Sequence, residues 1–350
     1  MNKISVQSEI DHAKRTDLYA KKVEQIYLLA TREAAKIGVS ISSVDSKIPF
    51  EFKDYPQTKA RIDKLIAGLY ANTAMVINEA TREEWLEACL MNDKLVGVFA
   101  DKVELTAEQL AKYQARNLDA LAAFQKRKAK GLNLSDRVWK YSKQFKGDIE
   151  MGLDVGLAEG KSAAELSRDL RQYLQEPDKL FHRVRDKNKD LVPSKSMKDY
   201  FVSRQSGGYA SSYKNAMRLT RTEINMAYRA SDYESNQQLD FVVGIEVKRS
   251  NHVFGCDVCE SLKGKYPKDF KFTGWHPQCR CYTLSVLATV DEFVQMQNGD
   301  NVNPKDTVKD LPEGFKKWVN ENADNIDHAT KKGKLPYFLE DNRWSIKESM

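Results

Sequence analysis

Residues 251–282 read NHVFGCDVCESLKGKYPKDFKFTGWHPQCRCY, and they hold four of the chain's five cysteines and one of its five histidines. The spacing is Cys-x2-Cys, sixteen residues, then His-x2-Cys-x-Cys. Structural zinc sites use four tetrahedral ligands, and thiolate sulfur and imidazole nitrogen are the preferred donors. The stretch therefore predicts a metal-binding element with the candidate ligands Cys256, Cys259, His276, Cys279 and Cys281.

Five donors are present for four places, so we expect that at least one of Cys279 and Cys281 is not a ligand. Cys279 pairs naturally with His276, whereas Cys281 begins an apolar run and can be a buried core residue. Spacing does not choose between them. Reduced cysteines packed in a core, and redox or disulfide chemistry, are the two other readings of the cluster. The expected cofactor is one structural Zn2+ per chain in a closed site.

The composition is that of an ordinary soluble protein of 350 residues, with 41% hydrophobic residues and a formal charge of +6. No apolar run reaches the roughly 18–20 residues that cross a bilayer, so no membrane partner is expected. The first twenty residues lack the apolar core of a signal peptide. We expect synthesis in a reducing cytoplasm, where clustered cysteines mark metal sites more often than disulfides.

The positive charge is concentrated in residues 181–221, which hold ten Lys and Arg against three Asp. A local basic excess of this kind favours a polyanion or an acidic protein surface as partner. The alternative reading is a solvated basic loop. The candidate nucleic-acid or partner contacts are Arg183, Arg185, Lys187, Lys189, Arg218 and Arg221.

Apolar residues recur every three or four positions through most of the first 175 residues, which is typical of amphipathic helices. The pattern predicts helices over 11–37, 56–77, from Thr81, over 106–130, from Ser135 to Gly160, and after Ser162. It fails over 177–208 and resumes as a helix over 209–239, followed by strands in FVVGIEVKR and CYTLSVLATV. The expected fold class is mainly α with a small α+β zinc-binding element and an extended helical N-terminal half.

Three motifs in this order resemble the phage Mu protein F-like family of minor head, or head morphogenesis, proteins. They are the Arg-x2-Arg-Thr-Glu helix in YKNAMRLTRTEINMAYRAS, the Cys-x2-Cys with a Leu-x-Gly-Lys turn in CDVCESLKGKYP, and HPQCRCY. The resemblance covers about residues 209–285, and residues 136–175 also resemble the family. It implies a low-copy structural component of the virion, made in the host bacterial cytoplasm and placed at the portal vertex. The implied partners are the portal protein, a major capsid or scaffold protein and non-specific double-stranded DNA, and the implied role is capsid assembly, genome packaging or ejection.

We expect five segments along the chain. A helical region over 1–130 would dock on the portal or capsid, 131–176 would be a helical core segment, and 177–208 a basic loop or arm. The Mu F-like module would span 209–290, and 291–350 would be a helical tail that packs back or contacts a neighbour. A fragment beginning near residue 132 is expected to fold and to hold zinc. The second reading is a zinc-dependent nuclease or nucleic-acid-processing enzyme, but no catalytic set stands out, so we do not expect an enzyme.

Overall fold

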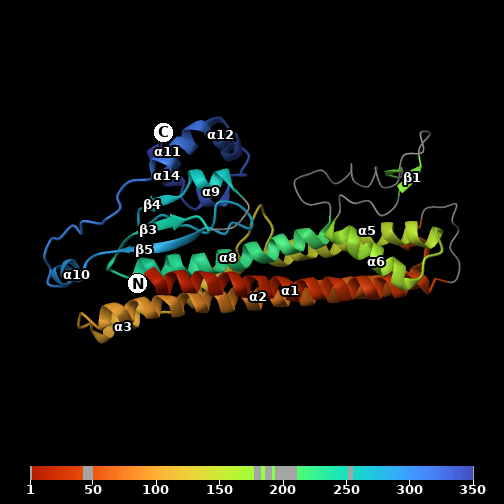
Figure 1. The fold of residues 1–350 in the computed structure, drawn as a ribbon, viewed down its shortest axis with the longest axis horizontal. Helices are drawn as coiled ribbons and strands as arrows, with labels where there is room; N and C mark the ends of the chain where they lie inside the picture. The colour runs from red at the N-terminus through yellow and green to blue at the C-terminus, as the bar shows by residue number, and fades with distance from the viewer. Residues whose placement is uncertain are drawn as a thin grey trace. The chain divides into compact units, whose positions relative to one another are not determined.

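The computed structural model describes residues 2–41, 50–176, 183–185, 191–193, 211–250 and 255–349 (Figure 1). The fold is mainly helical with a small three-stranded sheet, which confirms the predicted fold class at this level. The chain forms two compact units. Unit 1 consists of Met1–Asp17, Asn78–Gly131 and Arg221–Met350, and unit 2 of Leu18–Ile77 and Leu132–Thr220. None of the described helices is long and apolar enough to cross a membrane.

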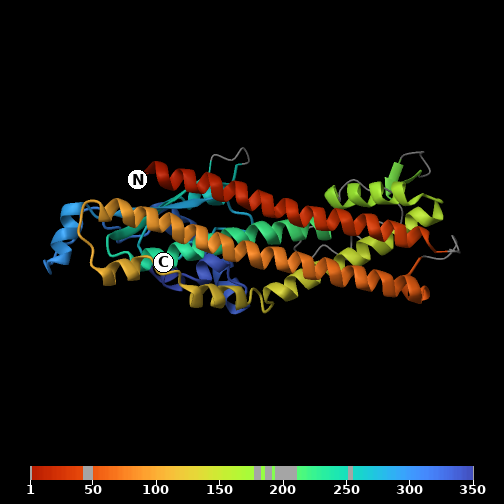
Figure 2. The same cartoon turned by 90° about the horizontal axis from the view of Figure 1, so that it is seen from below.

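Three long helices contribute to both units, namely α1 (Asn2–Val39), α2 (Pro56–Ala100) and α8 (Ser212–Gln238). Figure 2 shows α1 and α2 side by side. The helix start expected at Thr81 is wrong, because α2 continues through it and the Thr81 hydroxyl donates to the Asn78 carbonyl at 2.9 Å. A threonine inside a helix can bond backward in this way instead of capping. Since these helices run through both units, the units differ from the continuous segments expected from the sequence.

Unit 2 also contains α5 (Leu134–Ala158) and α6 (Ala163–Gln175). Asn133, and not Ser135, caps α5 by accepting from the Asp136 amide at 2.8 Å. Ser162 caps α6 as predicted, in a capping box with Glu165. The core includes an edge-to-face contact of Tyr27 with Phe145, whose ring centroids lie 5.4 Å apart. The short η1 helix is Phe52–Asp54.

Part of the predicted loop or arm over 177–208 is an antiparallel pair of strands. Strand β1 (Arg183–Arg185) pairs with β2 (Leu191–Pro193), and Val184 lies opposite Val192. The remainder of that range lies outside the described residues. The apolar pattern is too short here to predict strands of three residues.

The sheet of unit 1 has the order β4-β3-β5 and is antiparallel throughout. Its strands are β3 (Val242–Lys248), β4 (Gly264–Tyr266) and β5 (Tyr282–Leu287). One face packs on α8, where Thr283 bonds Asp232 at 2.7 Å and Ser285 bonds Asn236 at 2.9 Å. The predicted core residues of β3 are all buried: Val242, Ile245 and Val247. Within this sheet, the sequence analysis did not predict β4, which has three residues and no alternation of its own.

The helix predicted over 106–130 is divided into α3 (Ala107–Tyr113) and α4 (Leu118–Lys126). Thr106 caps α3 with Gln109 as N3 partner. The break lies at Asn117, whose backbone φ of 50° is left-handed. Asn adopts this conformation more readily than most residues and thereby ends the helical run.

The C-terminal segment contains α10 (Val290–Gln297), α11 (Glu313–Glu321), α12 (Ala323–Lys331), α13 (Tyr337–Glu340) and α14 (Arg343–Ser349). Helices α11 to α14 share one buried core with the cysteine stretch, in which Phe315 is fully buried against Tyr266 and Phe270. A Cβ at Gly314 would lie 2.3 Å from the carbonyl oxygen of Ser261. The C-terminal segment is therefore part of the same folded element as the metal-ligand candidates.

A second core of unit 1 joins the end of α2 to β3. The rings of Phe99 and Phe241 stack with centroids 4.0 Å apart, and Tyr113 meets Phe241 edge to face. A fragment beginning near residue 132 would lack Phe99 and Tyr113 and would expose the apolar side of β3. The expectation that such a fragment folds by itself conflicts with this core.

Candidate metal centre

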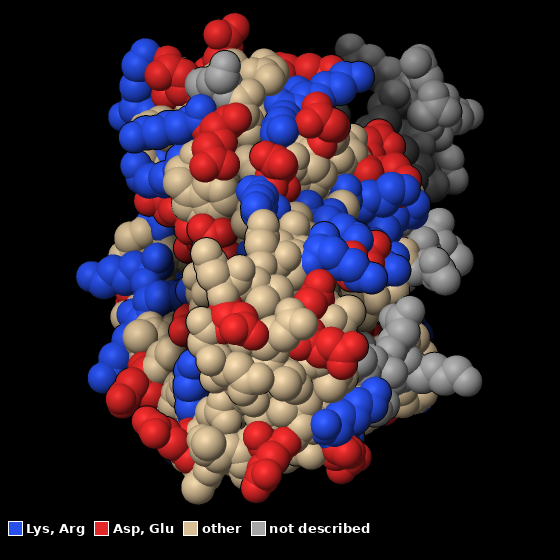
Figure 3. Space-filling view, turned by 90° about the vertical axis from the view of Figure 1, so that its left-hand side faces the viewer, with Lys and Arg blue, Asp and Glu red and all other residues tan. Residues whose placement is uncertain are grey.

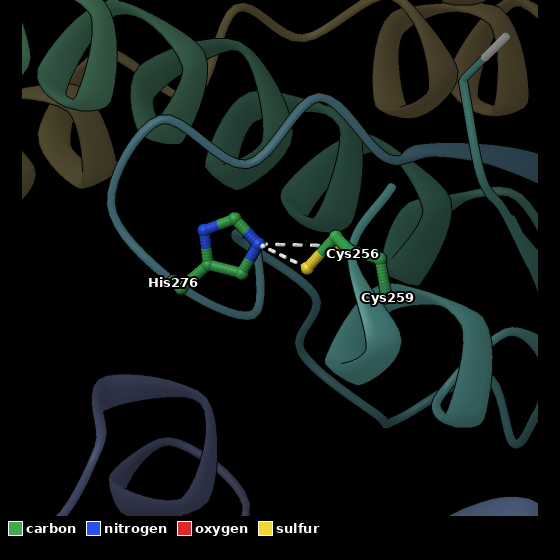
Figure 4. A group of neighbouring side chains, drawn as sticks. All are labelled: Cys256, Cys259 and His276. Atoms are coloured by element: carbon green, nitrogen blue, oxygen red, sulfur yellow. Dashed lines mark hydrogen bonds between the residues drawn. The ribbon is translucent and has the colours of Figure 1, made fainter. Parts of the chain in front are cut away.

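The Cys-x2-Cys motif lies at the start of the short helix α9 (Asp257–Ser261). Cys256 is the residue before the first helical turn, and Cys259 is buried within the helix. The turn carries both sulfur atoms to one side, where each lies close to the ring of His276 (Figure 4). The Nε2 atom of His276 is 3.2 Å from the Sγ of Cys256 and 3.1 Å from the Sγ of Cys259.

The orientation of His276 is fixed by its other ring nitrogen. Nδ1 lies 2.9 Å from the carbonyl oxygen of Pro277, which can only accept a hydrogen bond. Nδ1 therefore carries the proton in the neutral ring, and Nε2 presents its lone pair toward the two sulfurs. A backbone carbonyl that orients a histidine in this way is a common second partner of metal-binding imidazoles.

The remaining two thiols follow on a tight turn. The Cys279 amide donates to the His276 carbonyl at 3.0 Å, and Gln278 adopts a left-handed φ of 62°. The Gln278 amide donates to the Thr222 hydroxyl of α8 at 3.1 Å. This bond attaches the turn to the helix, and it compensates part of the cost of a left-handed conformation at a residue with a side chain.

All five candidate ligands are thus brought together. Cys256, Cys259 and His276 form one group, and Cys259, Cys279 and Cys281 form another; within each group the ligand atoms lie within 4.8 Å of one another. The sulfurs of Cys259 and Cys279 are 3.9 Å apart. Ligand distances of about 2.3 Å for Zn–S and about 2.0–2.1 Å for Zn–N give tetrahedral edges of about 3.8 Å between two sulfurs and about 3.6 Å between sulfur and nitrogen. Cys259 belongs to both groups and is the common member of the cluster.

The thiols modify one another's acidity. Hydrogen bonds from Cys259 and then Cys281 hold the pKa of Cys279 well below its usual range, because both stabilise its thiolate. The same contacts with Cys279 and Cys281 raise the pKa of Cys259. A cluster with one stabilised thiolate and further thiols beside it can exchange its protons for a soft divalent cation.

The absence of a side chain at Gly274 permits the turn that carries Cys279 to lie close to the backbone of residue 274. Its φ is 116°, and a Cβ there would meet the Cβ of Cys279 at 3.2 Å. The predicted turn at Gly264 also has a positive φ, of 151°. Gly255 has open space around it and carries no such requirement.

The Arg-Thr-Glu motif serves largely in internal contacts. Glu223 is buried and accepts from Arg127 at 2.8 Å, and Arg221 lies 3.4 Å from Asp17. Arg218 lies on the same helix. Of the other predicted basic contacts, Arg183 and Arg185 belong to β1, while Lys187 and Lys189 lie outside the described residues.

A buried ionic group near the N-terminus was missed by sequence reasoning. His12 is 4% exposed and contacts the Glu84 carboxylate at 2.6 Å and the Asn225 side chain at 3.2 Å. Arg15 donates to the same Glu84 at 2.5 Å. Polar residues spaced three or four positions apart on α1 are typical of a solvent-exposed helix face. Only the contact with α2 shows that this face is buried.

No family model, no curated protein and no solved structure matches this chain.

Proposed function

We propose that this chain is a minor head protein of a tailed phage, a low-copy structural component of the virion. The supporting observation is that its three motifs touch one another. Thr222 of the Arg-Thr-Glu helix binds Gln278, and His276 faces the sulfurs of the Cys-x2-Cys pair. The motifs on which the resemblance rests thus act together as one packed element, which is what a shared module would require.

The cluster in this proposal holds one structural zinc ion. Its donors are sulfur and imidazole nitrogen, which suit zinc better than the oxygen-preferring magnesium or calcium. Three of the four thiols are buried, and the C-terminal helices pack around them. Zinc here would add folding free energy to a small sheet and the short helices beside it, as it does in other structural sites.

The proposed partners are the portal protein, a capsid or scaffold protein and packaged DNA. The long helices α1 and α2 supply surface for protein contacts, and residues 181–221 supply positive charge for phosphate. On the face drawn in Figure 3, Lys and Arg are mixed with Asp and Glu, so this face offers no basic patch for DNA. We assign DNA contact to residues 181–221 because of their excess of Lys and Arg over Asp.

Co-assembly tests this proposal. The chain is produced together with the portal and capsid proteins of a tailed phage, and portal rings and particles are purified by sedimentation. We expect the chain in both fractions at a few copies per particle, and at a lower level for Cys259→Ser. A chain absent from rings and particles, or one that nicks plasmid DNA with added Mg2+ or Mn2+, would instead support the nuclease reading.

A further inference from the structure

Unit 1 contains a cavity of about 410 Å³ beside the metal cluster, and Gln278 and Cys279 belong to its lining. One wall is the N-terminal part of α1, the second is α8, and the third is the turn after His276 together with the start of β5. The volume lies within the range of small-molecule sites, about 300–1,000 Å³.

The α1 wall carries an apolar strip beside the polar side chains of Glu9, His12, Thr16 and Asp17. Val6, Ile10 and Ala13 follow one another at helical spacing and line the cavity, and Tyr282 lines it from β5. Val6 is 38% exposed and Ile10 is 44% exposed. A ligand with an apolar body would remove these side chains from water, and each Å² of apolar surface so covered contributes about 25 cal/mol.

The charges around the cavity do not cancel. Arg229 is paired with Glu9, and Arg221 lies 3.4 Å from Asp17. The third arginine of the lining, Arg280, is exposed and forms no ion pair with any residue that the structure describes. Three arginines against two carboxylates leave one positive charge at the rim of an apolar cavity.

We propose that this cavity binds an organic acid, that is, a carboxylate on an apolar body. The carboxylate pairs with Arg280 at the rim, and the apolar body covers Val6 and Ile10. The carboxylate can come from a small molecule or from the C-terminus of an apolar peptide. This inference does not depend on the proposed role in the virion.

Calorimetric titration of the zinc-loaded full-length chain tests it. The probes are hexanoate, hexanamide as the uncharged equivalent, and an acetylated apolar tripeptide with either a free or an amidated C-terminus. We expect hexanoate or the free-acid peptide to bind, and the matching amide to bind at least about tenfold more weakly, as the absence of a charge-assisted bond implies. Whichever acid binds more tightly identifies the source of the carboxylate.

Two pairs of variants locate the site. Arg280→Gln should weaken binding of the acid about tenfold, whereas Arg343→Gln, an equal charge change on α14, should leave it unchanged. Ile10→Asp should abolish binding, whereas Leu18→Asp, at another exposed position on α1 outside the lining, should not. Zinc content is measured for each variant, because Arg280 lies between two candidate ligands.

Three results would overturn the proposal. They are absence of binding by both acids, equal binding of acid and amide, and equal effects of Arg280→Gln and Arg343→Gln in proteins with the same zinc content.

Discussion

The Nε2 atom of His276 lies 3.1 Å from the sulfur of Cys259, although 17 positions separate the two residues in the chain. The ring is held in this orientation through the Pro277 carbonyl, which binds its other nitrogen. Two motifs that are distant in sequence thus present a nitrogen lone pair and a thiol to the same point. A metal ion at that point would be bound by both side chains.

Cys259 belongs to both ligand groups, so its removal should affect the cluster most. Cys259→Ser should release the metal and lower the free energy of unfolding by several kcal/mol, because metal binding contributes directly to folding. Cys89→Ser is the matched control, since Cys89 is also buried but contacts Ser231 and no other cysteine in the described structure. Elemental analysis and thermal unfolding measure both effects. Equal metal content in the two variants would exclude Cys259 as a ligand.

The choice between Cys279 and Cys281 can be made by paired substitutions. The distance of 3.9 Å between the Cys259 and Cys279 sulfurs fits the edge of a zinc tetrahedron of about 3.8 Å, so we expect Cys279 to be the fourth ligand. Cys279→Ala should abolish stoichiometric zinc binding, and Cys281→Ala should retain it. Cobalt substitution reports the result, because the ligand-to-metal absorption depends on the number of thiolates. Retention of metal in Cys279→Ala together with its absence in Cys281→Ala would reverse the assignment.

The clustering of the candidate ligands was the part of the site that sequence could predict. Thiols and a histidine at these spacings have few uses in a chain with so little other cysteine, and the structure brings all five candidates together. Their order of importance was not predictable, because the position of Cys259 in both groups depends on how α9 meets the turn at Gln278. The bond from Gln278 to Thr222 was equally hidden, since 56 positions separate the two residues.

The C-terminal helices pack closely on the ligand stretch, and this packing predicts that any side chain at residue 314 destabilises the fold. A Cβ there would lie 2.3 Å from the Ser261 carbonyl, so Gly314→Ala must displace α11 or the end of α9. We expect the free energy of unfolding to fall by about 1–3 kcal/mol, as for other overpacked sites. The control is Gly97→Ala, within α2 and with open space around it, which should stabilise by about 0.5–1 kcal/mol. Chemical denaturation that gave equal values for both variants would contradict the packing of α11 on α9.

The buried carboxylate of Glu84 predicts a dependence of stability on pH. Burial by itself raises the pKa of Glu84, but hydrogen bonds from His12 and Arg15 outweigh it and hold the pKa below its ordinary value. A carboxylate whose pKa is lowered by folding stabilises the fold above its unfolded pKa of about 4.3, and this contribution is lost as the pH falls through the folded value.

Glu84→Gln should therefore cost about 3–5 kcal/mol at pH 7, because it leaves Arg15 without its buried partner, and the difference from the parent should shrink below about pH 4. Glu79→Gln, at an exposed position on the same helix, should change stability by less than about 0.5 kcal/mol at either pH. Urea denaturation across this range measures both. A difference that stays constant from about pH 7 to about pH 3 would show that ionised Glu84 is not the source.

The basic segment predicts salt-dependent binding to double-stranded DNA. Replacing Arg183, Arg185, Lys187 and Lys189 with Gln should flatten the dependence of log affinity on log salt by about 0.9 for each phosphate that is no longer neutralised. Four exposed lysines near the C-terminus supply the control: Lys317, Lys331, Lys332 and Lys334. Fluorescence anisotropy at several salt concentrations measures the slopes. Equal slopes for both quadruple variants would assign the basic excess to a protein partner or to solvent.

Helical periodicity predicted most helices of the chain but not their assembly. Thr81 carried a capping pattern, yet the apolar positions on both sides of it continue one helical face, and burial of that face favours a single long α2. Phe99 and Phe241 also show that the sequence pattern does not predict which segments pack together. Each is an ordinary apolar residue in its own segment, and only their stacking reveals that the N-terminal half completes the core behind β3.

Metal stoichiometry of the native full-length chain tests the zinc assignment most directly. The protein is purified without added metal, and zinc is measured by elemental analysis together with the intact mass under native conditions. We predict about one zinc per chain, and a lower melting temperature after removal of the ion with a chelator. A chain that contains no metal, and whose melting temperature is unchanged by both zinc and chelator, would contradict it.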